Sequence, residues 1–334
     1  MNKIFKNSLL GTLLIAGGIA LSSCGGGGGT AGDDTGGNKT KLAFITNGAA
    51  DFWLYCQAGV QKAEAELGDV EITFKIGDGT AGKQKQMVDD LIVRGAKGIG
   101  ISPVNPRNQK DMIDEWAKKS TLITVDSDAP DSDRICYLGT DNIAAGRQAG
   151  ELVKEALPNG GKIMVFVGLG DAQNAVERYQ GVKEALAGTN IEVIDLRTDN
   201  MDLGKARRNA EDTITKYPDI AAMVGLWSYN APAILDALRD KKMLGAVKIV
   251  AFDEDPVTLK AIDNGEIFGT VVQNPYEFGY QSMKLVHGLV VGGKTAAELG
   301  VPANGQIIVD TKVIKQGEGQ KYLEYCNGLK ASLK

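Results

Sequence analysis

The sequence of 334 residues has little histidine and cysteine, with one and four residues respectively. Its one histidine, His287, lies in a helical-looking stretch without a neighbouring cysteine or histidine, so no metal site is predicted. There is no Gly-x-Ser-x-Gly motif, and no nucleophile stands at a recognisable spacing from His287. These absences argue against a metalloenzyme and against a serine hydrolase.

Clustered positive charge is also missing. The chain has 37 Lys and Arg against 42 Asp and Glu, a formal net charge of −5, and no basic run interleaves with aromatic residues. This balance argues against a nucleic acid partner. A content of 43% hydrophobic and 24% charged residues is typical of a globular protein.

The apolar run near the start is too short to cross a bilayer, which takes about 20 apolar residues. Lys3 and Lys6 precede it and residues 9–21 form it, which is the layout of a secretory signal. Cys24 follows Leu21-Ser22-Ser23, an arrangement that resembles the lipobox of bacterial lipoproteins, whose cysteine is acylated. We therefore expect a signal peptide over residues 1–23, lipidation at Cys24 and a glycine-rich tether over residues 24–40. The protein would work in the periplasm or otherwise outside the cytoplasm, held on a membrane by its lipid alone.

Three cysteines remain after Cys24, namely Cys56, Cys136 and Cys326. They can form at most one disulfide, and their spacings match no zinc signature. The chain beyond the tether is long enough for two domains and for a core that needs no cross-links. Buried free thiols are therefore favoured, and a disulfide stays open.

Short apolar runs alternate with amphipathic stretches along the rest of the chain. The runs predict strands over residues 42–46, 71–76, 98–102, 122–126, 135–139, 162–167, 192–196, 221–226, 248–252 and 269–273. The stretches between them predict helices over residues 54–67, 83–94, 109–118, 144–156, 177–186, 205–215, 231–241 and 257–264. Apolar strands alternating with helices are typical of parallel sheets built from β-α-β units.

The alternation repeats within the chain. Residues 41–45 lead to Gly59-Val60, residues 162–166 lead to Gly181-Val182, and the next elements follow in the same order in each half. The repeat predicts an α/β protein with two Rossmann-like lobes, each a parallel sheet flanked by helices.

Residues 77–83 (GDGTAGK) match the G-x-G-x-x-G pattern of phosphate-binding loops. Gln84, however, stands where a P-loop has the Ser or Thr that holds magnesium, and no acidic residue closes the next predicted strand to bind a ribose hydroxyl. We interpret the segment as a tight turn from strand to helix. No cofactor is predicted.

Polar and aromatic side chains follow the carboxyl ends of the predicted strands, where ligands bind in open α/β sheets. The set is Asn47, Phe52, Trp53, Asn105, Asp126, Asp128, Arg178, Trp227, Asn230, Asp253 and Gln273. Carboxylates, amides and arginine can pair with vicinal hydroxyls, and aromatic faces can cover a sugar ring. Several members have an alternative role: a helix N-cap for Asp126 and Asp253, core packing for Phe52, a surface charge for Arg178 and the end of an inter-lobe strand for Gln273. One shared sugar site explains the whole set.

From residue 41 to about residue 315 the chain resembles the periplasmic sugar-binding proteins of ABC transporters, of the ribose-binding type. The resemblance rests on the order of several short segments: Phe52-Trp53, residues 93–99 leading into Ser102-Pro103, residues 123–126, residues 139–142, Glu177-Arg178, Phe252-Asp253 and residues 272–275. It implies that Phe52 and Trp53 stack on the sugar ring. It also implies that Asp126, Arg178, Asp253 and Gln273 bind hydroxyls.

Two positions depart from the ribose-binding pattern. Ser127 stands where that family has an arginine, and Trp227 stands where it has an asparagine. The first change removes a bidentate donor and the second replaces hydrogen bonds by an apolar wall. We expect a reshaped pocket in which Asp128 partly replaces the missing contacts.

The resemblance predicts a receptor that captures a pentose or hexose between its lobes and delivers it to an ABC-transporter permease, acting as a monomer. The first lobe would span residues 41–140 plus 274–310 and the second residues 141–273 plus 311–334. Three crossovers, near Thr140-Asp141, Gln273-Asn274 and Asp310-Thr311, would form the hinge. The alternatives are a sugar sensor that signals to a chemoreceptor or kinase, and a glycosidase that uses Asp126 and Asp253.

Overall fold

The computed structural model describes residues 39–333. The predicted signal peptide, the lipidation site Cys24 and most of the predicted tether lie outside the described residues. Among residues 39–333, no helix has the length and apolar content needed to cross a membrane, and no cluster of side chains suits a metal ion.

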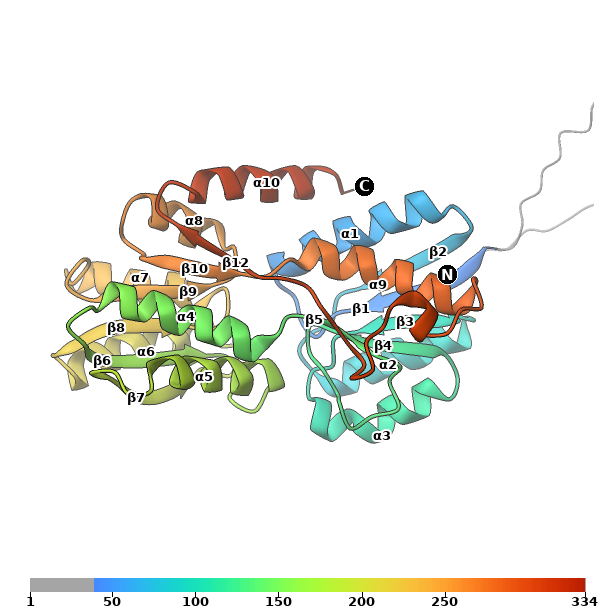
Figure 1. Ribbon diagram of the computed structural model, residues 1–334, viewed down its shortest axis with the longest axis horizontal. Coiled ribbons are helices and arrows are strands. Elements are labelled where there is room, and N and C mark those ends of the chain that lie inside the picture. The colour runs from blue at the N-terminus through green and yellow to red at the C-terminus, as the bar shows by residue number, and fades with distance from the viewer. Residues whose placement is uncertain (1–38, 334) are drawn as a thin grey trace, which may run out of the picture. The chain divides into compact units, whose positions relative to one another are not determined.

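Two six-stranded sheets organise this part of the chain (Figure 1). The first sheet has the order β11-β5-β4-β3-β1-β2 and comprises β1 (Thr40–Ile45), β2 (Val70–Lys75), β3 (Gly98–Ile101), β4 (Thr121–Val125), β5 (Tyr137–Gly139) and β11 (Gln306–Ile308). The second has the order β12-β10-β9-β8-β6-β7 and comprises β6 (Gly161–Val167), β7 (Ile191–Thr198), β8 (Ile220–Gly225), β9 (Lys248–Phe252), β10 (Gly269–Val272) and β12 (Lys312–Lys315). We call the two units the first lobe and the second lobe. Neighbouring strands are parallel, except that β12 is antiparallel to β10.

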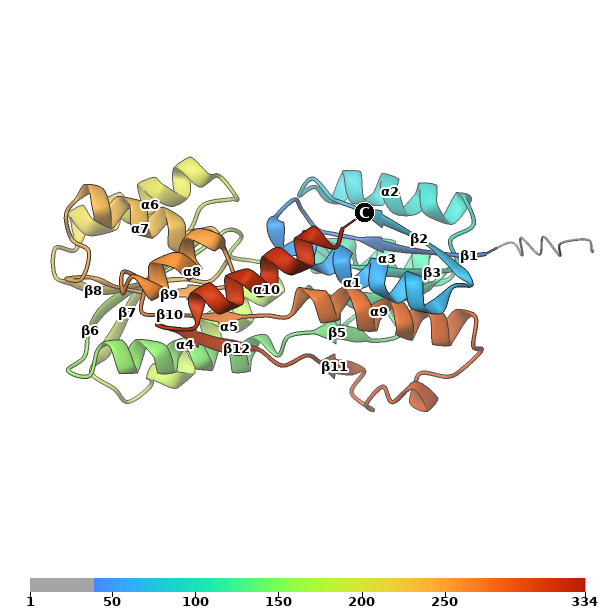
Figure 2. The same cartoon turned by 90° about the horizontal axis from the view of Figure 1, so that it is seen from above.

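Helices cover both faces of each sheet. Those of the first lobe are α1 (Asp51–Leu67), α2 (Ala81–Val93), α3 (Pro106–Ala117) and α9 (Pro275–Val290), with the short turn η1 (Ala297–Leu299) after α9. Those of the second lobe are α4 (Asn142–Ala156), α5 (Gln173–Leu186), α6 (Leu203–Lys216), α7 (Asn230–Asp240), α8 (Pro256–Asp263) and α10 (Gly319–Ala331). Figure 2 shows α10 running from α8 toward α1, where Lys330 donates to Asp51 over 2.6 Å.

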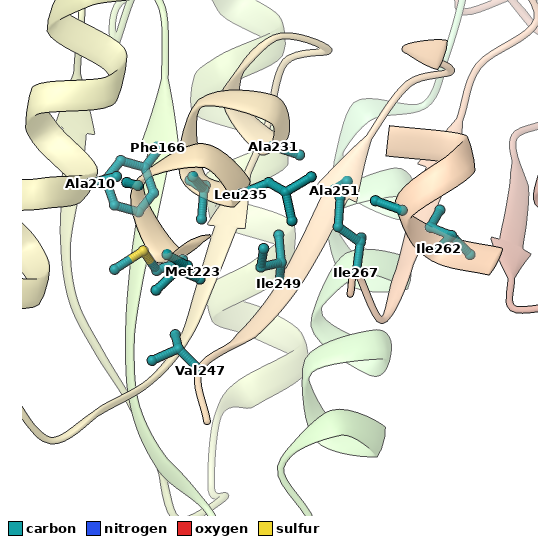
Figure 3. Close-up of a cluster of buried hydrophobic side chains, with 14 of the residues drawn as sticks. Phe166, Ala210, Met223, Ala231, Leu235, Val247, Ile249, Ala251, Ile262 and Ile267 are labelled. Carbon is teal, nitrogen blue, oxygen red and sulfur yellow. The ribbon is translucent and has the colours of Figure 1, made fainter. Parts of the chain in front are cut away.

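The strands are apolar throughout because alternate side chains point to opposite faces of the sheet and helices cover both faces. In β1, Leu42 and Phe44 face α1 and α9, while Ala43 and Ile45 face α2 and α3. The second lobe repeats this arrangement, with α4 and α5 on one face of β6 and α6 and α7 on the other. Figure 3 shows the latter core, in which Phe166 and Met223 of the sheet pack with Leu235 of α7.

Close helix pairs explain the internal repeat. A Cβ added to Gly59 of α1 would lie 2.0 Å from the carbonyl oxygen of Tyr276 in α9, and one added to Gly181 of α5 would lie 2.1 Å from that of Ile143 in α4. Both glycines are therefore required where two helix backbones meet. Gly59 and Gly181 are the first residues of the repeated Gly-Val pair.

The predicted strands and helices are all present, with shifts of a few residues at their ends. The short strands β11 and β12 and the helix α10 were not predicted, and of α9 only the stretch around His287 was recognised as helical. The three thiols of Cys56, Cys136 and Cys326 are free and buried, as favoured from the sequence.

The chain passes between the lobes three times, after β5, after β10 and after β11. Two of these crossovers are tied together, because the hydroxyl of Thr140 donates to Oε1 of Gln273 over 2.9 Å. The third is held to the second lobe, since Thr311 Oγ1 donates to Gln148 Oε1 over 2.7 Å. The segments that join the lobes therefore form a hydrogen-bonded hinge beside the strand ends.

Candidate functional site

A cavity of about 320 Å³ opens between the lobes at the carboxyl ends of their strands. Both lobes line it. Eight of the residues singled out from the sequence contribute: Asn47, Phe52, Trp53, Asp126, Arg178, Trp227, Asp253 and Gln273. The six side chains to which the family resemblance assigns sugar contacts thus all line one cavity.

Two aspartates occupy matching strand ends, Asp126 after β4 and Asp253 after β9. Each has a left-handed backbone, with φ of 64° and 66°. Each backbone N–H donates to the adjacent strand, Asp126 to Leu138 and Asp253 to Val271. Neither residue caps a helix, so that alternative is wrong for both.

Hydrogen bonds orient both carboxylates. Ser102 Oγ donates to Asp126 Oδ2 over 3.0 Å, and Gln273 Nε2 donates to Asp253 Oδ1 over 2.8 Å. Because Gln273 also accepts from Thr140, the carboxylate of Asp253 is linked to two of the hinge crossovers. We call Asp126, Arg178, Asp253 and Gln273 the floor of the cavity, and these hydrogen bonds join the floor to the hinge.

Arg178 projects from α5 and is only 1% exposed, so the surface-charge alternative is wrong. Its Nε donates to Asn142 Oδ1 over 3.0 Å and its Nη1 to the carbonyl of Leu226 over 2.9 Å. The guanidinium lies over the ring of Phe252, 4.7 Å from its centroid. Its Nη2 is buried without a partner, which leaves a charged donor available to a ligand in the cavity.

Burial has the largest effect on the pKa values of the two aspartates in the floor. It raises the pKa of Asp126 to about 6, with the positive charge of Arg178 opposing the shift. Burial raises the pKa of Asp253 as well, again against Arg178. Among the described residues, the charged groups that line the cavity are these two acids and Arg178. With no lysine and only one arginine there, the lining suits an uncharged ligand with hydroxyl groups better than an anion.

Aromatic walls stand on opposite lobes. Phe52 and Trp53 open α1 with ring centroids 5.0 Å apart and nearly perpendicular planes, and Trp53 also packs on Phe44. Across the cavity, Trp227 and Tyr229 lie with centroids 6.4 Å apart. Phe52 is partly buried and lines the cavity, so it belongs both to the core and to the site.

Three predicted site residues do not line the cavity. Asn105 caps α3, its Oδ1 accepting from the backbone N–H of Asn108 over 3.3 Å. Asp128 forms a buried ion pair with Arg134 and accepts from Thr124, so the expectation that it replaces missing ligand contacts is wrong. An arginine six residues later in the chain was the signal for that pairing.

Asn230, the third of these residues, supports the aromatic side chains of the second lobe through hydrogen bonds. Its Oδ1 accepts from the backbone N–H of Trp227 and its Nδ2 donates to Asp199 Oδ2, both over 3.0 Å. Asp199 also accepts from the hydroxyl of Tyr229 over 2.6 Å. Asp199 is fully buried and was not singled out from the sequence.

Asn174 and Tyr229 line the cavity although sequence analysis missed them. The Oδ1 atom of Asn174 and the Nε1 atom of Trp227 are buried without partners, like Nη2 of Arg178. Asn174 precedes Arg178 by four residues on α5, so the helical spacing that places both on one face was an available signal. Three unpaired polar atoms thus border one cavity.

A family model described as a periplasmic binding protein domain matches residues 42–295. The chain belongs to that family. In Escherichia coli, the ribose import binding protein RbsB is 26% identical over 254 residues, covering 74% of this chain and 83% of that protein. The D-allose-binding periplasmic protein is 25% identical over 255 residues, covering 73% and 82%.

Solved structures of periplasmic binding proteins share the fold. A solute-binding protein of an ABC transporter from Burkholderia graminis, in complex with D-arabinose, is 27% identical with a TM-score of 0.77. The match covers 84% of this chain and 96% of that one. The two α/β lobes described above are those of the periplasmic binding protein fold.

Proposed function

We propose that the protein captures a monosaccharide, a pentose or hexose, in the cavity between its lobes and delivers it to an ABC-transporter permease. One observation carries the proposal most strongly. Nη2 of Arg178, Oδ1 of Asn174 and Nε1 of Trp227 are all buried at the cavity without partners. Buried polar atoms are normally paired, and hydroxyl groups can satisfy both the two donors and the one acceptor.

The relatives support the same class of ligand. Their names refer to ribose and allose, and the structure from Burkholderia graminis holds D-arabinose. They are named as binding proteins, which leaves the glycosidase alternative without support. The ring would lie between Phe52 and Trp53 on one side and Trp227 on the other, with Asp126, Arg178, Asp253 and Gln273 on its hydroxyls.

Ligand bound between the lobes would favour their closed arrangement, because only that arrangement lets both lobes contact it. The hinge bonds from Thr140 to Gln273 and from Gln273 to Asp253 support this coupling, since the same side chains reach the cavity floor. The closed form would then be the state that a permease recognises.

Isothermal titration calorimetry with D-ribose, D-allose, D-arabinose, D-xylose and D-galactose tests the proposal. We expect at least one to bind, and Asp253→Asn to weaken that sugar by about 10- to 150-fold, as expected for a hydrogen bond to a charged group. Asp131→Asn, the same change at an exposed aspartate, should leave the affinity unchanged. Absence of heat with every sugar at millimolar concentration would exclude the proposal.

A lipid anchor at Cys24 is a separate part of the proposal, supported by the sequence around it. Metabolic labelling with a palmitate analogue should mark the wild-type protein and not Cys24→Ser. Labelling of both, or of neither, would count against the anchor while leaving sugar binding untouched.

A further inference from the structure

The cavity has two chemically different ends. Asp126, Arg178, Asp253 and Gln273 form a floor in which no residue is more than 6% exposed. Toward solvent the lining changes to Leu169, Met201 and Leu203, and the last two are 43% and 64% exposed. We call these three residues the mouth. Large apolar side chains exposed beside a ligand cavity mark a surface that an apolar group can cover.

The turn that carries Met201 is held in an unfavourable conformation. Asn200 and Met201 have φ of 59° and 62°, so two consecutive residues other than glycine occupy the left-handed region. Such residues are retained where the surrounding structure fixes them, and they cluster at ligand sites. The strain at Met201 therefore needs a support and suggests a role.

Asp199 supplies the support. Its Oδ1 accepts from the backbone N–H of Met201 over 2.8 Å and from the hydroxyl of Tyr229, while its Oδ2 accepts from Asn230. Through Asn230 it also fixes the backbone of Trp227. One buried carboxylate thus positions the mouth and the aromatic wall together.

Met201 also reaches the opposite lobe. A Cβ added to Gly79, in the turn between β2 and α2, would lie 3.0 Å from Met201 Cε. Gly79 has φ of 85°, so its turn itself favours glycine. The thioether of methionine is flexible and adapts to irregular apolar partners. Met201 is placed where it can cover a group that extends from the floor toward solvent.

We infer that the natural ligand is an uncharged sugar bearing an apolar substituent, with the ring on the floor and the substituent against Met201 and Leu203. This inference rests on the proposed function and narrows its ligand class. An unsubstituted sugar would present hydroxyl groups to the mouth, where Leu169, Met201 and Leu203 offer no hydrogen-bonding side chain. A charged substituent would lose hydration without gaining a partner among these three residues.

The test compares each parent sugar of the panel with its methyl and benzyl derivatives, either glycosides at the anomeric carbon or ethers at the terminal hydroxyl. Calorimetry should find at least one benzyl derivative that binds tenfold or more tightly than its parent. In the double variant Met201→Gln/Leu203→Gln, that gain of the derivative over its parent sugar should fall below threefold. Both side chains are exposed, so the variant should fold, and its Tm checks this.

Val93→Gln is the matched control, because Val93 is 86% exposed at the end of α2 and lies outside the cavity lining. It should keep the full gain. If parent sugars bind and every derivative binds more weakly, the inference fails and the proposed function stands. If the double variant keeps the tenfold gain, the mouth is not the subsite and the inference fails. If neither sugars nor derivatives bind, the proposed function itself fails.

Discussion

The same backbone geometry follows one strand in each of the two lobes. After β4 and after β9 the chain turns through a left-handed aspartate whose N–H bonds to the next strand. The carbonyl of each aspartate also accepts a side-chain hydroxyl, that of Tyr137 in the first lobe and that of Thr270 in the second. The backbone of the sheet, and not a helix cap, therefore aims both carboxylates at the cavity.

The lobes differ two residues further on. Asp128 follows Asp126 by the same interval at which Asp255 follows Asp253, yet the two have different roles. Asp255 caps α8 through the N–H groups of Val257 and Thr258, whereas the first lobe has no helix there and Asp128 pairs with Arg134. Equivalent positions in a repeat thus share backbone geometry without sharing side-chain chemistry.

Arg134 and Arg178 differ in whether they reach the cavity, and substitutions at these two arginines give the largest expected effect. Arg134→Met leaves the carboxylate of Asp128 buried without its partner, which should lower the free energy of unfolding by about 3–5 kcal/mol. Its affinity for sugar should be unchanged, since neither residue lines the cavity. Arg178→Met should lower sugar affinity at least 100-fold, and it should also lower stability because Asn142 and the carbonyl of Leu226 lose their donor. Urea unfolding and calorimetry measure the two effects.

A double variant that should regain part of the lost stability provides the control for Arg134→Met. Adding Asp128→Asn to Arg134→Met removes the isolated charge and should recover part of the lost stability. Loss of sugar affinity in folded Arg134→Met, comparable to that in Arg178→Met, would contradict the separation of roles.

The matching aspartates predict an unusual dependence of stability on pH. Because the folded pKa of Asp126 is about 6 against an ordinary 3.8, the native state holds this proton more tightly than the unfolded chain. The resulting loss of stability develops as pH rises from about 4 to about 6 and then stays constant, reaching on the order of 3 kcal/mol. Asp126→Asn should remove that loss, raising stability of the unliganded protein at pH 7.5 while weakening sugar binding.

Urea titrations of wild type and Asp126→Asn at pH 4 and pH 7.5 provide the measurement. The two proteins should be closest in stability at pH 4 and should diverge at pH 7.5. Parallel stabilities across this range would show that Asp126 does not carry the penalty. Asp253 is shifted in the same direction by burial, so Asp253→Asn should behave alike in sign.

The strands and helices of both lobes are well predicted from the sequence because each follows from the residues of its own segment. Apolar runs mark strands buried on both faces, and Gly59 and Gly181 mark the helix contacts of the repeat. The strands β11 and β12 escaped prediction since each is short and its place at a sheet edge depends on chain segments distant in sequence.

The candidate site was predictable where a side chain's role follows from the strand it ends, as for Asp126 and Asp253. It was not predictable where the role depends on a partner elsewhere in the chain. Asp199 is the clearest case, because its function comes from Tyr229 and Asn230, about thirty residues away. The mouth residue Met201 depends in turn on Asp199.

Two asparagines at matching strand ends provide the finest comparison, with effects of about 1 kcal/mol. Asn105 follows β3 and caps α3, while Asn230 follows β8 and holds Trp227 and Asp199. Changing either to alanine should lower the free energy of unfolding by about 1 kcal/mol. Only Asn230→Ala should also weaken sugar binding, by several-fold, because Trp227 loses its backbone support and Asp199 a donor. Equal affinities for the two variants in calorimetry would mean that the aromatic wall holds its position without Asn230, and that the strand ends of the two lobes are more alike in role than their hydrogen bonds indicate.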